Sequence, residues 1–158
     1  MLTHQPENYR CPFCLVAQGF EGDSVYTKPA DIIYQDSDIT AFIASHWWPN
    51  NPGHVIVIPN AHIENLYQIP DVTLSKIHRF SKQVAHALKD TYRCDGVSVR
   101  QHNEPAGDQD IWHYHLHIFP RYHGDNLYEN NTQKQLSQPS ERIPYASKLK
   151  VWLNQVDL

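Results

Sequence analysis

Residues 112–121 read Trp112-His-Tyr-His-Leu-His-Ile-Phe-Pro-Arg121 and place His113, His115 and His117 at every second position. Side chains of a β-strand alternate between its two faces, so this spacing predicts a strand over residues 111–119 with all three imidazoles on one face. On a helix the same spacing would scatter the rings around the axis. Because an imidazole can attack phosphorus, transfer a proton or bind a metal ion, three in alternation predict a functional site.

The length and composition predict one ordinary globular domain. The 158 residues suffice for a single core that needs no disulfide bonds. A formal net charge of -4 argues against nucleic acid as the main partner, so an anionic ligand would need local donors. No signal-peptide pattern and no apolar run of membrane-spanning length is visible, and three cysteines fit a reducing compartment. We therefore expect a cytoplasmic protein without a membrane partner.

The order of predicted elements favours an α+β fold with an antiparallel sheet. The polar residues 1–10 predict a poorly ordered lead-in to a single domain over residues 11–158. A short helical turn is expected over residues 15–19. In addition to the histidine strand, β-rich runs predict strands at residues 32–35, 39–44, 54–58 and 97–102.

Two helices and one long loop complete the prediction. Apolar residues at three- and four-residue spacing predict a helix over residues 72–92, with Asp71 as its N-cap. Residues 124–140 are rich in Asn, Gln and Ser and predict a long mobile loop. Pro144 is expected to open a last helix.

Cys11 and Cys14 have the C-x-x-C spacing of both a metal-binding knuckle and a redox dithiol. A redox dithiol would need a preceding strand, which residues 1–10 do not offer. Two thiolates do not complete a structural zinc site, and the candidates for the other two ligands are His62 and His113. The spacing alone leaves both alternatives open.

The histidine segment and its surroundings resemble the histidine triad superfamily. Residues 113–119 match its pattern of three histidines alternating with apolar residues, and residues 53–59, which include His54, match further upstream. Other matching positions are His62, Asn103, Glu104, Gly107 and Gln109. The resemblance covers roughly residues 11–121. Phe119-Pro120-Arg121, followed by Gly124-Asp125, is more similar to the fragile histidine triad branch of dinucleoside polyphosphate hydrolases.

The resemblance implies the histidine triad fold, a mostly antiparallel sheet of five to six strands with one long helix and a C-terminal helix. It implies an enzyme, a nucleotide hydrolase or nucleotidyl transferase. Such an enzyme would cleave the α-phosphate linkage of a dinucleoside polyphosphate or nucleoside phosphoramidate through a nucleotidyl-histidine intermediate. It also implies a homodimer.

Individual roles carry over by position. The resemblance makes His115 the nucleophile, which attacks the α-phosphorus. His117 and His54 would hydrogen-bond phosphate or leaving-group oxygens. Asn103 and Gln109 would donate to the phosphate and to the bridging oxygen. In zinc-carrying members of the family the pattern assigns the metal to four other residues, which are Cys11, Cys14, His62 and His113. Such a closed site would anchor the strand and would not activate water.

Two departures from the family pattern keep other functions open. Many relatives have Ser or Thr where this chain has Asp110, and no ribose-binding carboxylate can be placed. These departures favour, as an alternative, a nucleotide-binding regulatory module with little turnover. A metallohydrolase that uses His113 and His115 as a metal-binding pair is a third hypothesis.

Four further side chains have two interpretations each. Trp47 and Trp48 could stack on a nucleobase or rim a dimer, but packing on the core and over the loop is slightly favoured. Arg100 and Arg121 could contact phosphates or could pair with carboxylates on a solvated face.

Overall fold

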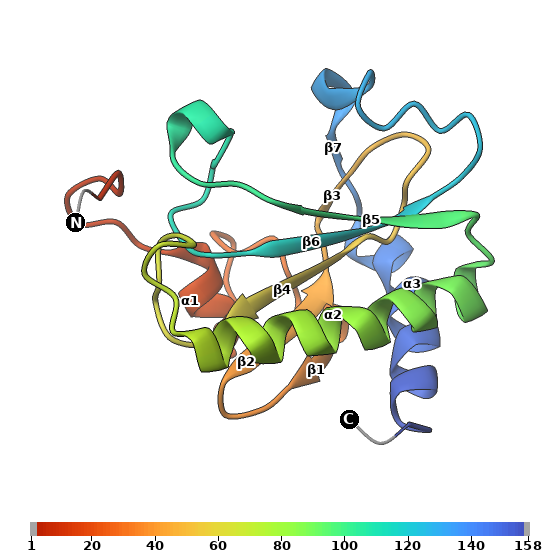
Figure 1. Ribbon diagram of the computed structural model, residues 1–158, viewed down its shortest axis with the longest axis horizontal. Coiled ribbons are helices and arrows are strands. Elements are labelled where there is room, and N and C mark those ends of the chain that lie inside the picture. The colour runs from red at the N-terminus through yellow and green to blue at the C-terminus, as the bar shows by residue number, and fades with distance from the viewer. Residues whose placement is uncertain (1–2, 157–158) are drawn as a thin grey trace.

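The computed structural model describes residues 3–156 and has an α+β architecture, as predicted (Figure 1). Five antiparallel strands form the main sheet in the order β1-β2-β4-β6-β5. The strands of this sheet are β1 (Ile32–Gln35), β2 (Ile39–Ile43), β4 (Val55–Pro59), β5 (Gly96–Gln101) and β6 (Leu116–Arg121). The helices are α1 (Pro12–Ala17), α2 (Asp71–Tyr92) and α3 (Pro139–Leu153), with 3-10 turns η1 (Pro29–Asp31), η2 (Pro105–Gly107) and η3 (Asn131–Gln133). Within residues 3–156, no helix has both the length and the apolar character needed to cross a membrane.

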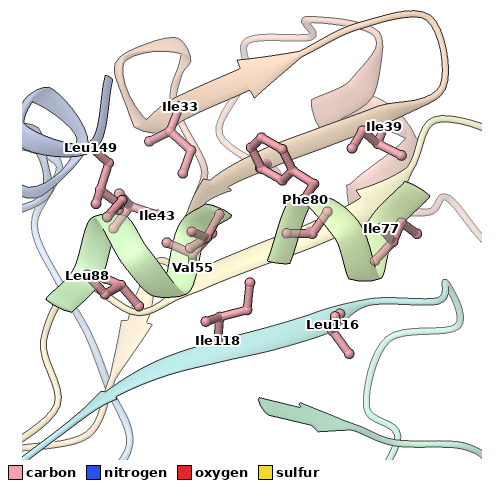
Figure 2. Packing of buried hydrophobic residues seen from close by; sticks show 14 of the residues in the cluster. Ile33, Ile39, Ile43, Val55, Ile77, Phe80, Leu88, Leu116, Ile118 and Leu149 are labelled. Atoms are coloured by element: carbon pink, nitrogen blue, oxygen red, sulfur yellow. The ribbon is translucent and has the colours of Figure 1, made fainter. Parts of the chain in front are cut away.

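The central strands β2 and β4 are buried on both faces because different elements cover each face of the sheet. Alternate residues of β2 divide between two hydrophobic clusters: Ala41 and Ile43 belong to the cluster under α2 and α3, and Phe42 to the cluster under α1. Figure 2 shows the first cluster, in which Phe80 of α2 and Ile118 of β6 take part. Burial on both faces fixes the strand register, since a slip by one residue would exchange the two sets.

The histidine strand is shorter than the sequence predicts. β6 begins at Leu116, so His113 and His115 lie before it in an irregular segment. The pairing ends there because the backbone turns away from β4: the Tyr114 N–H donates to the Ile63 carbonyl at 2.6 Å. Of the three histidines, His117 lies within the strand.

The predicted loop over residues 124–140 contains regular structure. It includes η3 and a short strand β7 (Gln135–Leu136), which pairs with β3 (His46–Trp47). The N–H and hydroxyl of Ser137 both donate to the Ser45 carbonyl at 2.8 Å. The polar composition concealed this strand because its pairing partner lies about ninety residues earlier.

Both long helices begin earlier than predicted. Asp71 is the first residue of α2, and Pro70 takes the cap position. α3 begins at Pro139, so Pro144 lies inside the helix and does not open it. Its start is set by a capping box between Gln138 and Glu141.

Residues 3–10, for which the sequence predicts little order, make defined contacts. The backbone N–H of His4 donates to the Glu64 carboxylate at 2.8 Å, and the Thr3 hydroxyl donates to the same carboxylate. The Tyr9 hydroxyl accepts from the Trp112 N–H at 3.3 Å. This segment therefore packs beside the histidine segment. Residues 1–2 of the predicted lead-in lie outside the described residues.

Candidate functional site

Four side chains that could hold a metal converge where α1 meets the histidine segment. The Cys11 Sγ lies 3.3 Å from the His113 Nδ1, and the Cys14 Sγ lies 3.2 Å from the His62 Nδ1 and 3.5 Å from the His113 Nδ1. All four ligand atoms lie within 4.8 Å of one another. α1 brings the two cysteines close together, because Cys11 caps the helix and Cys14 lies in its first turn.

Hydrogen bonds orient both histidine rings of this cluster for a metal. The Nε2 of His113 donates to the Pro59 carbonyl at 2.9 Å, and the Nε2 of His62 donates to the Gln5 side-chain oxygen at 2.9 Å. Each Nδ1 therefore carries a lone pair directed at the sulfur atoms. Tetrahedral zinc with ordinary Zn–S and Zn–N bonds would separate nitrogen from sulfur by about 3.5 Å. These residues therefore fit zinc closely.

A cavity of about 280 Å³ lies next to this cluster. His54, His115 and His117 form one wall of it, and β4 and β6 bring the first and last of these histidines together. Apolar side chains, among them Phe13 and Phe42, line the part beside His115.

His115 is held in one tautomer by its neighbour along the chain. Its Nδ1 lies 2.7 Å from the His113 carbonyl oxygen, which can only accept, so Nδ1 carries the proton. The lone pair is then on Nε2, for which residues 3–156 supply no hydrogen-bond partner. The ring is packed edge-on against Phe13 at 5.3 Å between centroids. Burial lowers the pKa of His115, which favours the neutral ring.

His54 and His117 form a pair at 3.4 Å between the His54 Nε2 and the His117 Nδ1. His54 also stacks on Phe119, with 4.3 Å between the ring centroids. Burial, aided by the Arg100 charge, lowers the pKa of His54 to about 3. Burial and the neighbouring histidines lower the pKa of His117 well below its usual value. Both rings are therefore neutral near pH 7 and can donate or accept hydrogen bonds.

Two of the predicted phosphate-binding residues do not line the cavity. The Asn103 side chain accepts from the Leu66 N–H at 2.8 Å and donates to Gln101 at 2.7 Å. The buried Gln109 side chain donates to the Glu64 carbonyl at 2.6 Å and accepts from the Glu104 N–H at 2.8 Å. Both amides hold loops in place through these bonds, and neither residue is among those that line the cavity.

The tryptophans and arginines that had two interpretations are distinguished by their contacts. Trp47 packs on the core, and its Nε1 donates to the Ala44 carbonyl at 2.7 Å. Trp48 is buried and lines the cavity. Arg121 pairs with the Asp125 carboxylate at 2.7 Å, whereas Arg100 lines the cavity.

Sequence reasoning missed several cavity residues. His46, His102 and Lys134 line it, and no role was predicted for any of them. Lys134 reaches the cavity because the pairing of β7 with β3 places the segment before β7 beside the histidines. Asp110 lies at the same cavity and pairs with Lys134 at 3.2 Å. No local motif signals these positions, since each depends on a long-range contact.

Comparison with known proteins gives consistent matches. The profile of the HIT domain matches residues 26–124. An uncharacterized HIT-like protein of Methanocaldococcus jannaschii is 32% identical over 115 residues, which cover 73% of this chain and 81% of that protein. The structure of a zinc-bound histidine triad family protein from Mycobacterium smegmatis is 27% identical, with a TM-score of 0.73 and coverage of 92% and 94%. A Hit-like protein from Bartonella henselae, solved with an unknown ligand, is 25% identical, with a TM-score of 0.74 and coverage of 94% and 99%.

Proposed function

The chain belongs to the HIT domain family, and we propose that it is a nucleotide hydrolase or nucleotidyl transferase that works through a nucleotidyl-histidine intermediate. The bond that it cleaves is the α-phosphate linkage of a nucleotide conjugate, either a dinucleoside polyphosphate or a nucleoside phosphoramidate. One observation carries the proposal: His115 has its Nδ1 proton held by a backbone carbonyl, and its ring lines a cavity of about 280 Å³.

In the first step the Nε2 lone pair of His115 attacks the α-phosphorus. A nitrogen–phosphorus bond forms, the bond from phosphorus to the leaving group breaks, and its electron pair departs with that group. The carbonyl of His113 stabilises the positive charge that develops on the ring, because it accepts from Nδ1. Asn103 and Gln109 would act here through the loops they hold, because neither side chain lines the cavity.

In the second step water attacks the same phosphorus. The nitrogen–phosphorus bond breaks, the electron pair returns to Nε2, and the water proton leaves with the product or with a neighbouring base. The neutral pair His54 and His117 lies beside His115 and can donate to phosphate oxygens or to the leaving group. A neutral imidazole suits this cycle because it is both a nucleophile and a good leaving group.

Zinc, when bound, would be held by Cys11, Cys14, His62 and His113 and would supply a structural cross-link. Its link to the chemistry is indirect: the carbonyl that fixes His115 belongs to His113. The same geometry weighs against a metallohydrolase. The Nδ1 of His113 faces the thiols, and among the described residues no metal-ligand group includes His115.

The alternative, a binding module with little turnover, draws support from Asp110 and from the engagement of Asn103 and Gln109 elsewhere. The deciding experiment is a panel of diadenosine polyphosphates and adenosine phosphoramidate, assayed for AMP release with wild type and His115→Ala. Turnover by wild type that His115→Ala abolishes supports the enzyme. Nucleotide binding without product in wild type supports the module, and full activity of His115→Ala rejects the mechanism. The homodimer stays a prediction, which sedimentation analysis of the purified chain can check.

A further inference from the structure

The end of the cavity that lies away from Phe13 and Phe42 carries two cations, Arg100 and Lys134, and Lys134 is paired there with Asp110. Asp108 also lines the cavity, so the formal charges balance, and Arg100 is the cation for which the described residues form no ion pair. The proposed chemistry at His115 gives neither cation a task. Their position raises the question of what negative group they face.

Arg100 lies directly beside the catalytic wall. It is the residue of β5 that pairs with His117 of β6, so the two side chains are cross-strand neighbours on one face of the sheet. Its guanidinium lies over the rings of Phe119 at 4.5 Å, Trp48 at 5.3 Å and Tyr128 at 5.5 Å. No carboxylate within residues 3–156 forms an ion pair with it. Aromatic faces hold this cation in place but leave its N–H groups available.

Lys134 approaches the same end from the other side of the cavity. Its Nζ lies 5.8 Å from the Trp48 ring centre and 3.2 Å from the Asp110 carboxylate. Both partners of this ion pair are substantially exposed, so the pair is weak and can exchange for a stronger anion. β7 fixes the approach, because it begins at the next residue.

Three buried polar atoms at this end have no hydrogen-bond partner: the Trp48 Nε1, the His54 Nδ1 and the Arg100 Nε. Trp48 and His54 are 7% and 1% exposed. Buried polar groups are nearly always paired, and these three atoms belong to residues that line one cavity, so a ligand bound there is a candidate for the partner they lack. Trp48 and Arg100 can only donate through these atoms, so the missing partner is an acceptor.

The cavity thus has an apolar part beside His115 and a donor-rich part beside His117 and His54, in which Arg100 lacks an ion-pair partner among the described residues. The nucleoside of a nucleotide is neutral and partly apolar, so it suits the first part. We propose that Arg100 and Lys134 form a subsite for an anionic leaving group, and that the enzyme prefers nucleotides with further phosphates beyond the α-phosphate. This inference rests on the proposed function. It separates phosphoanhydride substrates from phosphoramidates, whose leaving amine carries no negative charge.

The test compares two substrates that share the AMP group, diadenosine triphosphate and adenosine 5′-phosphoramidate. Arg100→Gln should lower kcat/KM for the triphosphate by about 10- to 100-fold, the usual effect of losing hydrogen bonds to a charged group, and for the phosphoramidate by less than about threefold. Lys134→Gln should lower only the triphosphate value, by about threefold, because its side chain is more exposed. Asp110→Asn should change it in the opposite direction, because it frees Lys134.

The selectivity ratio keeps the test independent of folding. Both substrates are assayed on the same preparation, so the active fraction cancels from the ratio of the two kcat/KM values. Arg79→Gln and Lys82→Gln, on the exposed surface of α2, are matched controls and should leave the ratio unchanged. If Arg100→Gln fails to fold, Arg100→Lys is assayed in its place. This variant keeps the charge, so it should retain part of the wild-type selectivity ratio.

An equal loss on both substrates, or no loss on either, overturns the subsite. If wild type releases AMP from neither substrate, the proposed function fails and the subsite is tested by binding. Tryptophan fluorescence of wild type is then titrated with ATP and with AMP. Weaker binding of ATP alone in Arg100→Gln and Lys134→Gln supports the subsite, whereas unchanged ATP binding in both variants rejects it.

Discussion

His113 of the metal-ligand group and His115 of the cavity wall belong to the same segment, and the two differ in which ring nitrogen is bonded to a backbone carbonyl oxygen. His113 has its Nε2 bonded to the Pro59 carbonyl, which turns Nδ1 toward Cys11 and Cys14. His115, two residues later, has its Nδ1 bonded to the His113 carbonyl, which leaves the Nε2 lone pair without a partner. The residue type is the same, and the nitrogen that is anchored decides which ring atom is left for a ligand: Nδ1 of His113, which faces the thiols, and Nε2 of His115, which the proposed mechanism uses to attack phosphorus.

The largest effect is expected when the proposed nucleophile is removed. His115→Ala should lower kcat/KM for AMP release by at least about 10³-fold, since no other group can replace the attacking nitrogen. Zinc content and the thermal midpoint should remain near those of wild type. Steady-state kinetics with metal analysis on the same samples measures both. A variant with substantial residual activity would remove His115 from the role assigned here.

The next largest effect is expected in the cysteine–histidine group that could hold a metal. Cys14→Ser should lose the zinc and lower the free energy of unfolding by about 4 kcal/mol, because loss of a structural metal is among the largest single-residue effects. At temperatures where the variant stays folded, AMP release should fall by less than about tenfold. Denaturant unfolding and metal analysis check this prediction. Complete loss of activity in a folded, zinc-free variant would show that the metal takes part in the chemistry.

A milder change sharpens the role of the anchoring bond. Gln5 accepts from the His62 Nε2, and outer partners of metal ligands contribute about 10- to 100-fold to metal affinity. This contact is exposed, so Gln5→Ala should weaken zinc binding by about tenfold and leave AMP release unchanged. Competition with a chromogenic chelator measures the affinity. Unaltered zinc affinity would mean that His62 needs no anchor.

The smallest expected effect is the contribution of His54, in the cavity wall, to the pH dependence of stability. His54 has a folded-state pKa of about 3, below its unfolded value, so the unfolded chain binds more protons and stability falls as pH drops below about 6.5. Between pH 7 and 5.5 this group alone should cost about 1 kcal/mol. Removal of His54 should abolish this part of the pH dependence. The difference between wild type and His54→Gln in denaturant unfolding isolates it, because the zinc ligands are common to both.

The sequence predicted the parts of the fold that local patterns encode. The β-rich runs of β2 and β4 and the amphipathic spacing of α2 gave the correct element types, because both patterns reflect burial against the core. The strand β7 could not be predicted, because it depends on pairing with β3 far away in the chain. The late start of β6 at Leu116 also depends on a distant segment, because the Tyr114 N–H donates to the Ile63 carbonyl.

The candidate site divides in the same way. The spacing of the two cysteines pointed to residues that the structure brings together with two histidines as a group that could hold a metal ion. The alternation of the histidines pointed to residues that line the cavity. The end of the cavity that holds Arg100 and Lys134 could not be predicted from the sequence. Lys134 comes from a segment whose composition suggested a loop, and Arg100 required the register of β5 against β6.

The most direct measurement of the central claim is to trap the intermediate. Wild type is mixed with diadenosine triphosphate for a fraction of a second, quenched under alkaline conditions, digested and analysed by mass spectrometry. We expect an adenylyl group on His115 that is absent from His115→Ala, with the peptide containing Cys11 and Cys14 unmodified. Turnover without any adduct on His115, or an adduct on His113, would contradict the division of roles between the two histidines.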